Sequence, residues 1–149
     1  MARFAVAPLV FLIAAASAAP VTGAGDPAFG YWQTANGGAI VEIAACAEGA
    51  CGDMVWMRQP TDEAGAPRLD SDGRPLCGLT LVSGLKQTGT GQWERGEIVD
   101  PRSGTVYSAE VSVLDPEHLE VRGYVLSTLF GKSQIWTRTT SDRGGCLAG

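Results

Sequence analysis

Apolar and polar residues alternate in short runs along most of the chain, and glycine, proline, asparagine and aspartate separate the runs. Alternation with a period of two is typical of strands that bury one face, and no window sustains the period of an amphipathic helix. A short helical turn is expected only at 126–132. The pattern therefore predicts an all-β protein with strands at 31–34, 39–46, 51–57, 76–82, 93–99, 105–114, 119–125 and 134–138.

The register of the first long hairpin can be predicted from Cys46 and Cys51, because a disulfide between them would place the two residues directly opposite each other. In that register one side of the hairpin carries only apolar pairs and the other side is mixed, as expected for a hairpin that packs on a core. The predicted apolar pairs are Ile43 with Met54 and Val41 with Trp56.

Consecutive one-sided strands with short turns form a meander. Closing a meander into a barrel buries every inner face and removes both exposed edges. We therefore expect a small up-and-down antiparallel β-barrel of about eight strands, with a two-sheet sandwich as the alternative that the same strand count permits.

The N-terminal residues differ from the rest in composition. Residues 1–18 combine one early arginine, an uncharged apolar run and a small-residue triplet, which is the pattern of a secretory signal peptide cleaved near Ala18. The apolar run is shorter than the roughly 20 residues that span a bilayer. We expect a linker at 19–28, one barrel domain at 29–140 and a glycine-rich tail at 141–149, located in the periplasm or secreted, with no membrane span in the mature chain.

The expected compartment decides how the four cysteines are interpreted, and the overall charge limits the classes of partner. Thiols in an oxidising compartment tend to pair, so we expect disulfides between Cys46 and Cys51 and between Cys77 and Cys146, the alternative being a thiolate metal site on which all four converge. Closing loops of these lengths stabilises by about 2 and about 4 kcal/mol, respectively. The net charge of −5 and the lack of a Lys/Arg cluster along the sequence argue against nucleic-acid partners.

Candidate chemistry is sparse. The sequence "DSDG" at 70–73 resembles the start of a calcium loop, but Arg74 and Leu81 occupy later ligand positions, so a solvated turn is the better interpretation. His118 is the only histidine, and no nucleophile motif accompanies it, although Arg122 and Glu97 could meet it in the fold. We expect no catalytic residues, no metal and no cofactor.

Several segments, taken in order, resemble the secreted bacterial family catalogued as domain of unknown function 2147. They are "GYWQT", "AIVEIAACAEGACGDMVWM", "RPLCGLTLVSGLK", "WERGEIVDPRSGTVYSAEVSV" and "LEVRGYVLSTLFGKSQIWTR", which together cover 30–138. The resemblance implies a lipocalin-like, or calycin-type, barrel without an established reaction or ligand. It also implies that Gly30, Trp32 and Arg138 close the barrel, with the arginine over the indole, a contact worth roughly 0.5 to 2 kcal/mol.

The interior of such a barrel is either a filled core or a pocket for one small ligand, and periodicity does not separate the two. We expect a non-catalytic module that binds a small hydrophobic or amphipathic molecule. The alternative is a solid barrel that binds an envelope protein through its rim, at the 61–74 loop or the tail. The interior residues expected to contact a ligand are Val41, Ile43, Met54, Trp56, Tyr107 and Val111.

Overall fold

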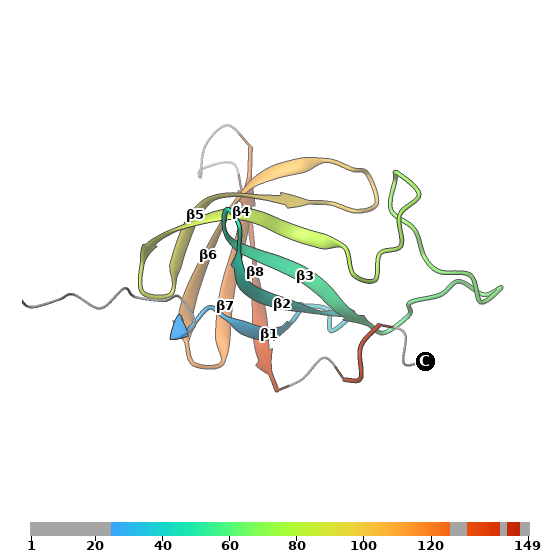
Figure 1. Cartoon of the computed structure of the whole chain (residues 1–149), viewed down its shortest axis with the longest axis horizontal. Coiled ribbons are helices and arrows are strands. Elements are labelled where there is room, and N and C mark those ends of the chain that lie inside the picture. The colour runs from blue at the N-terminus through green and yellow to red at the C-terminus, as the bar shows by residue number, and fades with distance from the viewer. Residues whose placement is uncertain (1–24, 126–130, 141–142, 147–149) are drawn as a thin grey trace, which may run out of the picture.

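The computed structural model describes residues 25–125, 131–140 and 143–146. All its named elements are strands, which pair antiparallel in chain order and close into one barrel (Figure 1). The all-β barrel prediction is confirmed, and the sandwich alternative is not formed. The strands are β1 (Gly30–Gln33), β2 (Ala39–Cys46), β3 (Gly49–Met57), β4 (Thr80–Gly89), β5 (Gln92–Val99), β6 (Val106–Asp115), β7 (His118–Tyr124) and β8 (Gly131–Thr139).

Some expectations lie outside the described residues. The signal peptide at 1–18, the first part of the linker, and 126–130 of the expected helical turn belong to this group. The last two residues of that turn, Gly131 and Lys132, are the start of β8 instead. Within the described ranges, no helix is both long enough and apolar enough to cross a membrane.

The fourth strand was predicted in the wrong place, at 76–82 instead of Thr80–Gly89. Residues before it form a turn in which the Gly78 amide donates to the Met54 carbonyl and Gly78 has φ +85°. Gly84, with φ +67°, interrupts β4 itself. These glycines hide the alternation that would otherwise mark β4. The strand still contributes to the core, because Leu85 is completely buried.

The predicted register of the β2–β3 hairpin was wrong by two residues. Cys46 lies opposite Gly49, and Cys51 lies opposite Ala44, so the Cys46–Cys51 disulfide runs diagonally across the hairpin. The turn is shorter than expected because Gly49, at φ +130°, packs against Leu85, where an added Cβ would lie 2.0 Å from the carbonyl oxygen. A shift of two residues keeps each side chain on its predicted face.

A β-bulge further along this hairpin changes the face of Trp56. The pairing moves from Val41 opposite Met54 to Ile40 opposite Trp56, which leaves Val55 as the extra residue. Trp56 therefore lies on the outer face of the barrel rather than inside it. There the Arg143 guanidinium carbon is 4.9 Å from the centre of the indole, so the C-terminal segment covers this face.

The second disulfide, Cys77–Cys146, fixes that segment to the start of the turn before β4. The Cys146 Sγ also lies 3.7 Å from the Met54 carbonyl oxygen on β3. Both predicted pairings are confirmed, and all four cysteines are bonded. Arg143 and Cys146 thus both contact β3.

The seam between β1 and β8 closes the barrel, with Trp32 opposite Arg138. Trp32 is completely buried, and the Arg138 guanidinium carbon lies 4.0 Å from the centre of its ring. Arg138 also donates to the carbonyls of Phe29 and Pro116, at 3.1 and 2.6 Å. An added Cβ at Gly30 would lie 2.9 Å from the Arg138 Nη1 and would need φ +124°, so glycine fits this position.

Asp26 fixes the N-terminal segment over the same closed end. Its two carboxylate oxygens accept hydrogen bonds from the amides of Ala28 and Gly91, from the Gln87 side chain and from the Trp93 indole, at 2.8 to 3.1 Å. One carboxylate therefore joins the segment before β1 to the β4–β5 hairpin.

Replacing Asp26 with alanine should lower the free energy of unfolding by about 1–3 kcal/mol, because the nearly buried Trp93 indole N–H loses its acceptor. Urea denaturation followed by tryptophan fluorescence would measure the loss. Glu94→Ala, which removes an exposed carboxylate from the neighbouring position of β5, is the matched control and should change stability by less than 0.5 kcal/mol, roughly the usual surface effect. Equal effects of the two substitutions would contradict this role of Asp26.

Candidate functional site

The interior of the barrel is filled in one half and hollow in the other. The closed half, beside the Trp32 seam, holds completely buried or nearly buried side chains that form one cluster: Trp32, Val41, Ile43, Val82, Leu85, Trp93, Val111 and Leu119. At the opposite end lie a cavity of about 970 Å³ and an adjoining one of about 600 Å³. Both cavities are lined by Asn36, Ile98, Arg102, Gln134 and Trp136, so they form one continuous space at the mouth.

The floor of this space is apolar. Its side chains come from strands all around the barrel: Met54 and Met57 from β3, Leu81 from β4, Ile98 from β5, Val121 from β7 and Trp136 from β8. Trp136 is only 3% exposed, and its indole N–H donates to Gln134 Oε1 at 3.1 Å. The floor therefore offers apolar surface with its one indole donor already satisfied.

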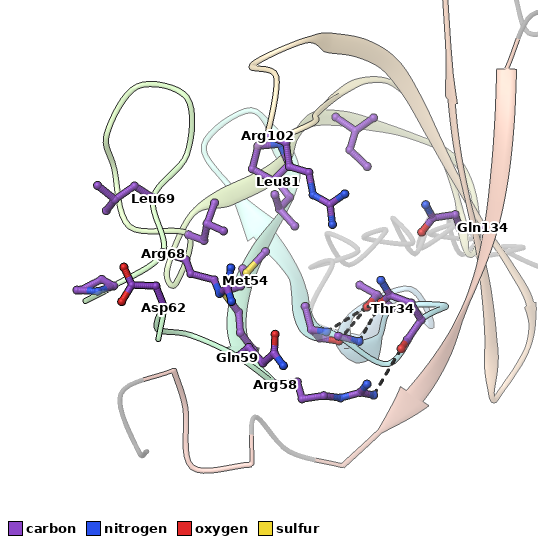
Figure 2. Close-up of a pocket in the computed structure, with 18 of the residues that line it drawn as sticks. Thr34, Met54, Arg58, Gln59, Asp62, Arg68, Leu69, Leu81, Arg102 and Gln134 are labelled. Atoms are coloured by element: carbon purple, nitrogen blue, oxygen red, sulfur yellow. Dashed lines mark hydrogen bonds between the residues drawn. The ribbon is translucent and has the colours of Figure 1, made fainter. Parts of the chain in front are cut away.

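The rim of the mouth is polar and carries four cations. Figure 2 shows Arg58, Arg68 and Arg102 around the larger cavity, with Gln134 reaching in from β8. Lys132 lines the smaller cavity beside Arg102. Asp62 and Asp100 are the two acidic residues in these linings.

The long connection between β3 and β4 extends to one side of the barrel (Figure 1), and several of its residues line the larger cavity, so it forms one side of the mouth. Two isolated bridges, Thr61 with Pro67 and Leu69 with Pro75, give it internal order. At its tip the Ser71 amide donates to the Pro101 carbonyl at 3.1 Å, which joins this connection to the turn that bears Arg102. Two separate segments of the rim are thus held together.

The calcium-like sequence at 70–73 forms a turn within this connection. The Asp70 carboxylate accepts the amides of Asp72 and Arg74 at 2.9 and 2.8 Å and pairs with the Arg74 guanidinium at 2.7 Å. The backbone hydrogen bond from Arg74 is the main reason that the pKa of the Asp70 carboxyl lies below its usual value. Among the described residues no three His, Cys, Asp or Glu side chains gather as a metal site would require.

His118 lies at the closed end, as the first residue of β7, where its Nδ1 is 2.9 Å from both carboxylate oxygens of Asp115. Arg122 bonds Ser133 on β8, and Glu97 lies on β5, two strands from Arg122. The three residues that could have met from the sequence do not converge, and none of them lines the mouth.

The predicted interior residues divide into three groups. Met54 and Tyr107 line the cavities. Val41, Ile43 and Val111 lie in the filled half, where each is at most 1% exposed and none lines either cavity. Trp56 lies on the outer face because the bulge places Met57, not Trp56, on the cavity wall.

The cationic rim was not predicted, although a signal for it is present in the sequence. Arg58 directly follows one predicted strand, and Arg102 follows another by three residues. In an up-and-down meander, alternate strands end at the same end of the barrel, so residues after odd-numbered strands gather there. Combining topology with charge would have identified this rim.

Comparison with known proteins gives two matches. A family model described as "Uncharacterized protein conserved in bacteria (DUF2147)" matches residues 30–138. The chain is also similar to a solved structure described as "Protein HP1028 from the human pathogen Helicobacter pylori belongs to the lipocalin family". The identity is 15% and the TM-score 0.58, over 77% of this chain and 84% of that chain, which supports a shared fold alone. No curated protein matches the sequence.

Proposed function

Since the chain belongs to the DUF2147 family of uncharacterized bacterial proteins, whose description names no activity, we infer its function from the cavity. We propose that the protein binds a small amphipathic molecule. The observation that carries this proposal is a barrel with a filled closed half and a hollow, apolar-floored open half. Ligand pockets usually measure about 300–1,000 Å³, with apolar walls and a few placed polar groups. The larger cavity, at about 970 Å³, has this size and composition.

The cavity favours a binding module over a solid barrel that acts only through its rim. A purely structural barrel would bury its floor completely, whereas here Met57, Leu81 and Ile98, which line the cavity, are only partly buried. Covering such apolar surface is favourable by about 25 cal/mol per Å² removed from water. Burying an apolar ligand tail against this surface would therefore be favourable, whereas a solid core would leave no such surface to cover.

Among the described residues that line the mouth there is no histidine or cysteine, and the role that we propose is carriage or storage without catalysis. The two disulfides and the signal-peptide pattern of residues 1–18 support an oxidising compartment, the periplasm or the exterior. A ligand collected there would reach the open mouth from solution. An envelope protein could receive it at the same rim.

The decisive experiment is the titration of delipidated protein with N-phenyl-1-naphthylamine, an uncharged apolar fluorophore. Saturable binding is expected, and Ile98→Trp should weaken it at least tenfold because the indole fills space that both cavities share. Ile135→Trp is the matched control, since Ile135 lies on the outside of β8 and is 41% exposed. No saturable uptake by the unaltered protein, or equal uptake by a folded Ile98→Trp variant, would refute the proposal.

A further inference from the structure

The cations at the mouth differ in their partners from three other arginines of the chain. Elsewhere, Arg74 pairs with Asp70, Arg138 lies over Trp32 and Arg143 lies over Trp56. In contrast, the four rim cations form no ion pair with any described residue. They are Arg58, Arg68, Arg102 and Lys132.

The two acidic residues of the rim do not neutralise these cations. The Asp62 Oδ1 accepts the amides of Ala64 and Ala66, both at 2.9 Å, and the Asp100 Oδ1 accepts the Arg102 amide at 2.9 Å. Both carboxylates therefore shape turns of the backbone. The mouth keeps an excess of positive charge in a chain whose net charge is −5.

The arginines also differ in how firmly they are held. Arg58 donates from Nη2 to the Gly37 carbonyl at 2.9 Å, and Arg68 donates from Nε to the Thr61 carbonyl at 3.1 Å. Each keeps further N–H groups for a ligand, because a guanidinium has five. Arg102 has no hydrogen bond from its side chain to the described residues, and Figure 2 shows it extending over the open space between the β3–β4 connection and Gln134.

We infer that the ligand is an anionic amphiphile, whose oxyanion head group binds Arg102 with Arg58 and Arg68 and whose apolar tail lies against Ile98 and Trp136. This inference rests on the proposed function and specifies its ligand class. A guanidinium matches the geometry of a carboxylate or a phosphate through paired N–H bonds. The apolar floor below the same arginines accounts for the tail.

The test compares four probes with one dodecyl tail and different head groups: dodecanoate, dodecyl phosphate, dodecanol and dodecyltrimethylammonium. Each ionic probe is titrated calorimetrically below its micelle-forming concentration, and dodecanol below its solubility limit, at low salt. At least one anionic probe should bind ten times more tightly than dodecanol, and the cationic probe should bind most weakly. The preference should decrease in high salt, because the exposed rim charges are screened over about 10 Å at 0.1 M salt.

Substitutions of the rim arginines test whether these residues cause the preference for an anionic head group. Arg102→Gln should weaken binding of the anionic probe about fivefold and change dodecanol binding less than twofold. A triple variant should bind the anionic probe and dodecanol equally; it combines Arg58→Gln, Arg68→Gln and Arg102→Gln. Arg122→Gln, on the outer face of β7, removes the same charge away from the mouth and should leave the preference unchanged.

The outcomes separate the two proposals. Equal binding of dodecanol and both anionic probes to the unaltered protein would overturn the anionic ligand and leave the amphipathic binding module standing. An anionic preference that survives in the triple variant would overturn the role of these arginines. If no probe binds and the fluorophore also fails, the binding module itself is refuted. A preference between dodecanoate and dodecyl phosphate would identify the head group.

Discussion

Replacing Trp32 with alanine is expected to lower the free energy of unfolding by about 3–5 kcal/mol, the range for a large aromatic removed from a core. Trp32 is completely buried, donates its indole N–H to the Ala28 carbonyl at 2.8 Å, and supports the Arg138 guanidinium on its face. Its loss would leave a cavity and would free the arginine at the seam between the first and last strands. Small domains are stable by only about 5–15 kcal/mol in total, so the effect is large.

Trp56→Ala provides the control, because it removes the same side chain from the outer face of the barrel, where Trp56 is only partly buried. We expect a clearly smaller loss from this variant. Urea denaturation of both variants, followed by circular dichroism, makes the comparison. Equal losses would mean that the seam contributes no more to stability than the contact of the tail with β3.

Removing the Cys77–Cys146 disulfide with two serines is expected to lower the free energy of unfolding by about 4 kcal/mol, in the chain-entropy account of cross-links. The bond joins residues 69 positions apart, and it ties the C-terminal segment to the base of the connection that forms one side of the mouth. The unfolded chain without it has many more conformations to lose.

The Cys46–Cys51 pair offers a built-in comparison. It spans only 5 positions within one hairpin, so replacing both of its cysteines with serine should cost about 2 kcal/mol. Denaturation of the two double variants under oxidising conditions measures both values. A larger loss from the short loop than from the long one would contradict the entropic explanation and would indicate that hairpin geometry dominates.

The sequence predicted the architecture well because alternation is a local property that records which face each strand buries. Val41, Ile43 and Val111 were expected inside the barrel and are inside it. Alternation says nothing about where along the barrel axis the interior is filled, however. These three residues therefore appeared as pocket residues, although they form core in the closed half.

The errors arose where the backbone departs from a regular strand. The bulge at Val55 moved Trp56 outward, and the outer position is apolar because Arg143 and the tail cover it, so the pattern gave no warning. The glycines at 78 and 84 hid the true limits of β4. The cationic rim was missed for another reason, since Arg58, Arg68 and Arg102 are distant in sequence and gather only through the topology.

The seam between β1 and β8 also determines how the protein can fold. It brings Arg138 onto Phe29, residues 109 positions apart, so closure waits until the last strand has been made and, if the chain is exported, has crossed the membrane. The other paired strands are neighbours in the chain, so this distant pairing carries the largest loop-closure cost and is expected to form late. Until then β1 lacks its second partner, and an unpaired strand edge is a site for aggregation. We therefore expect the newly made chain to depend on protection during this interval, whatever ligand the finished barrel takes up.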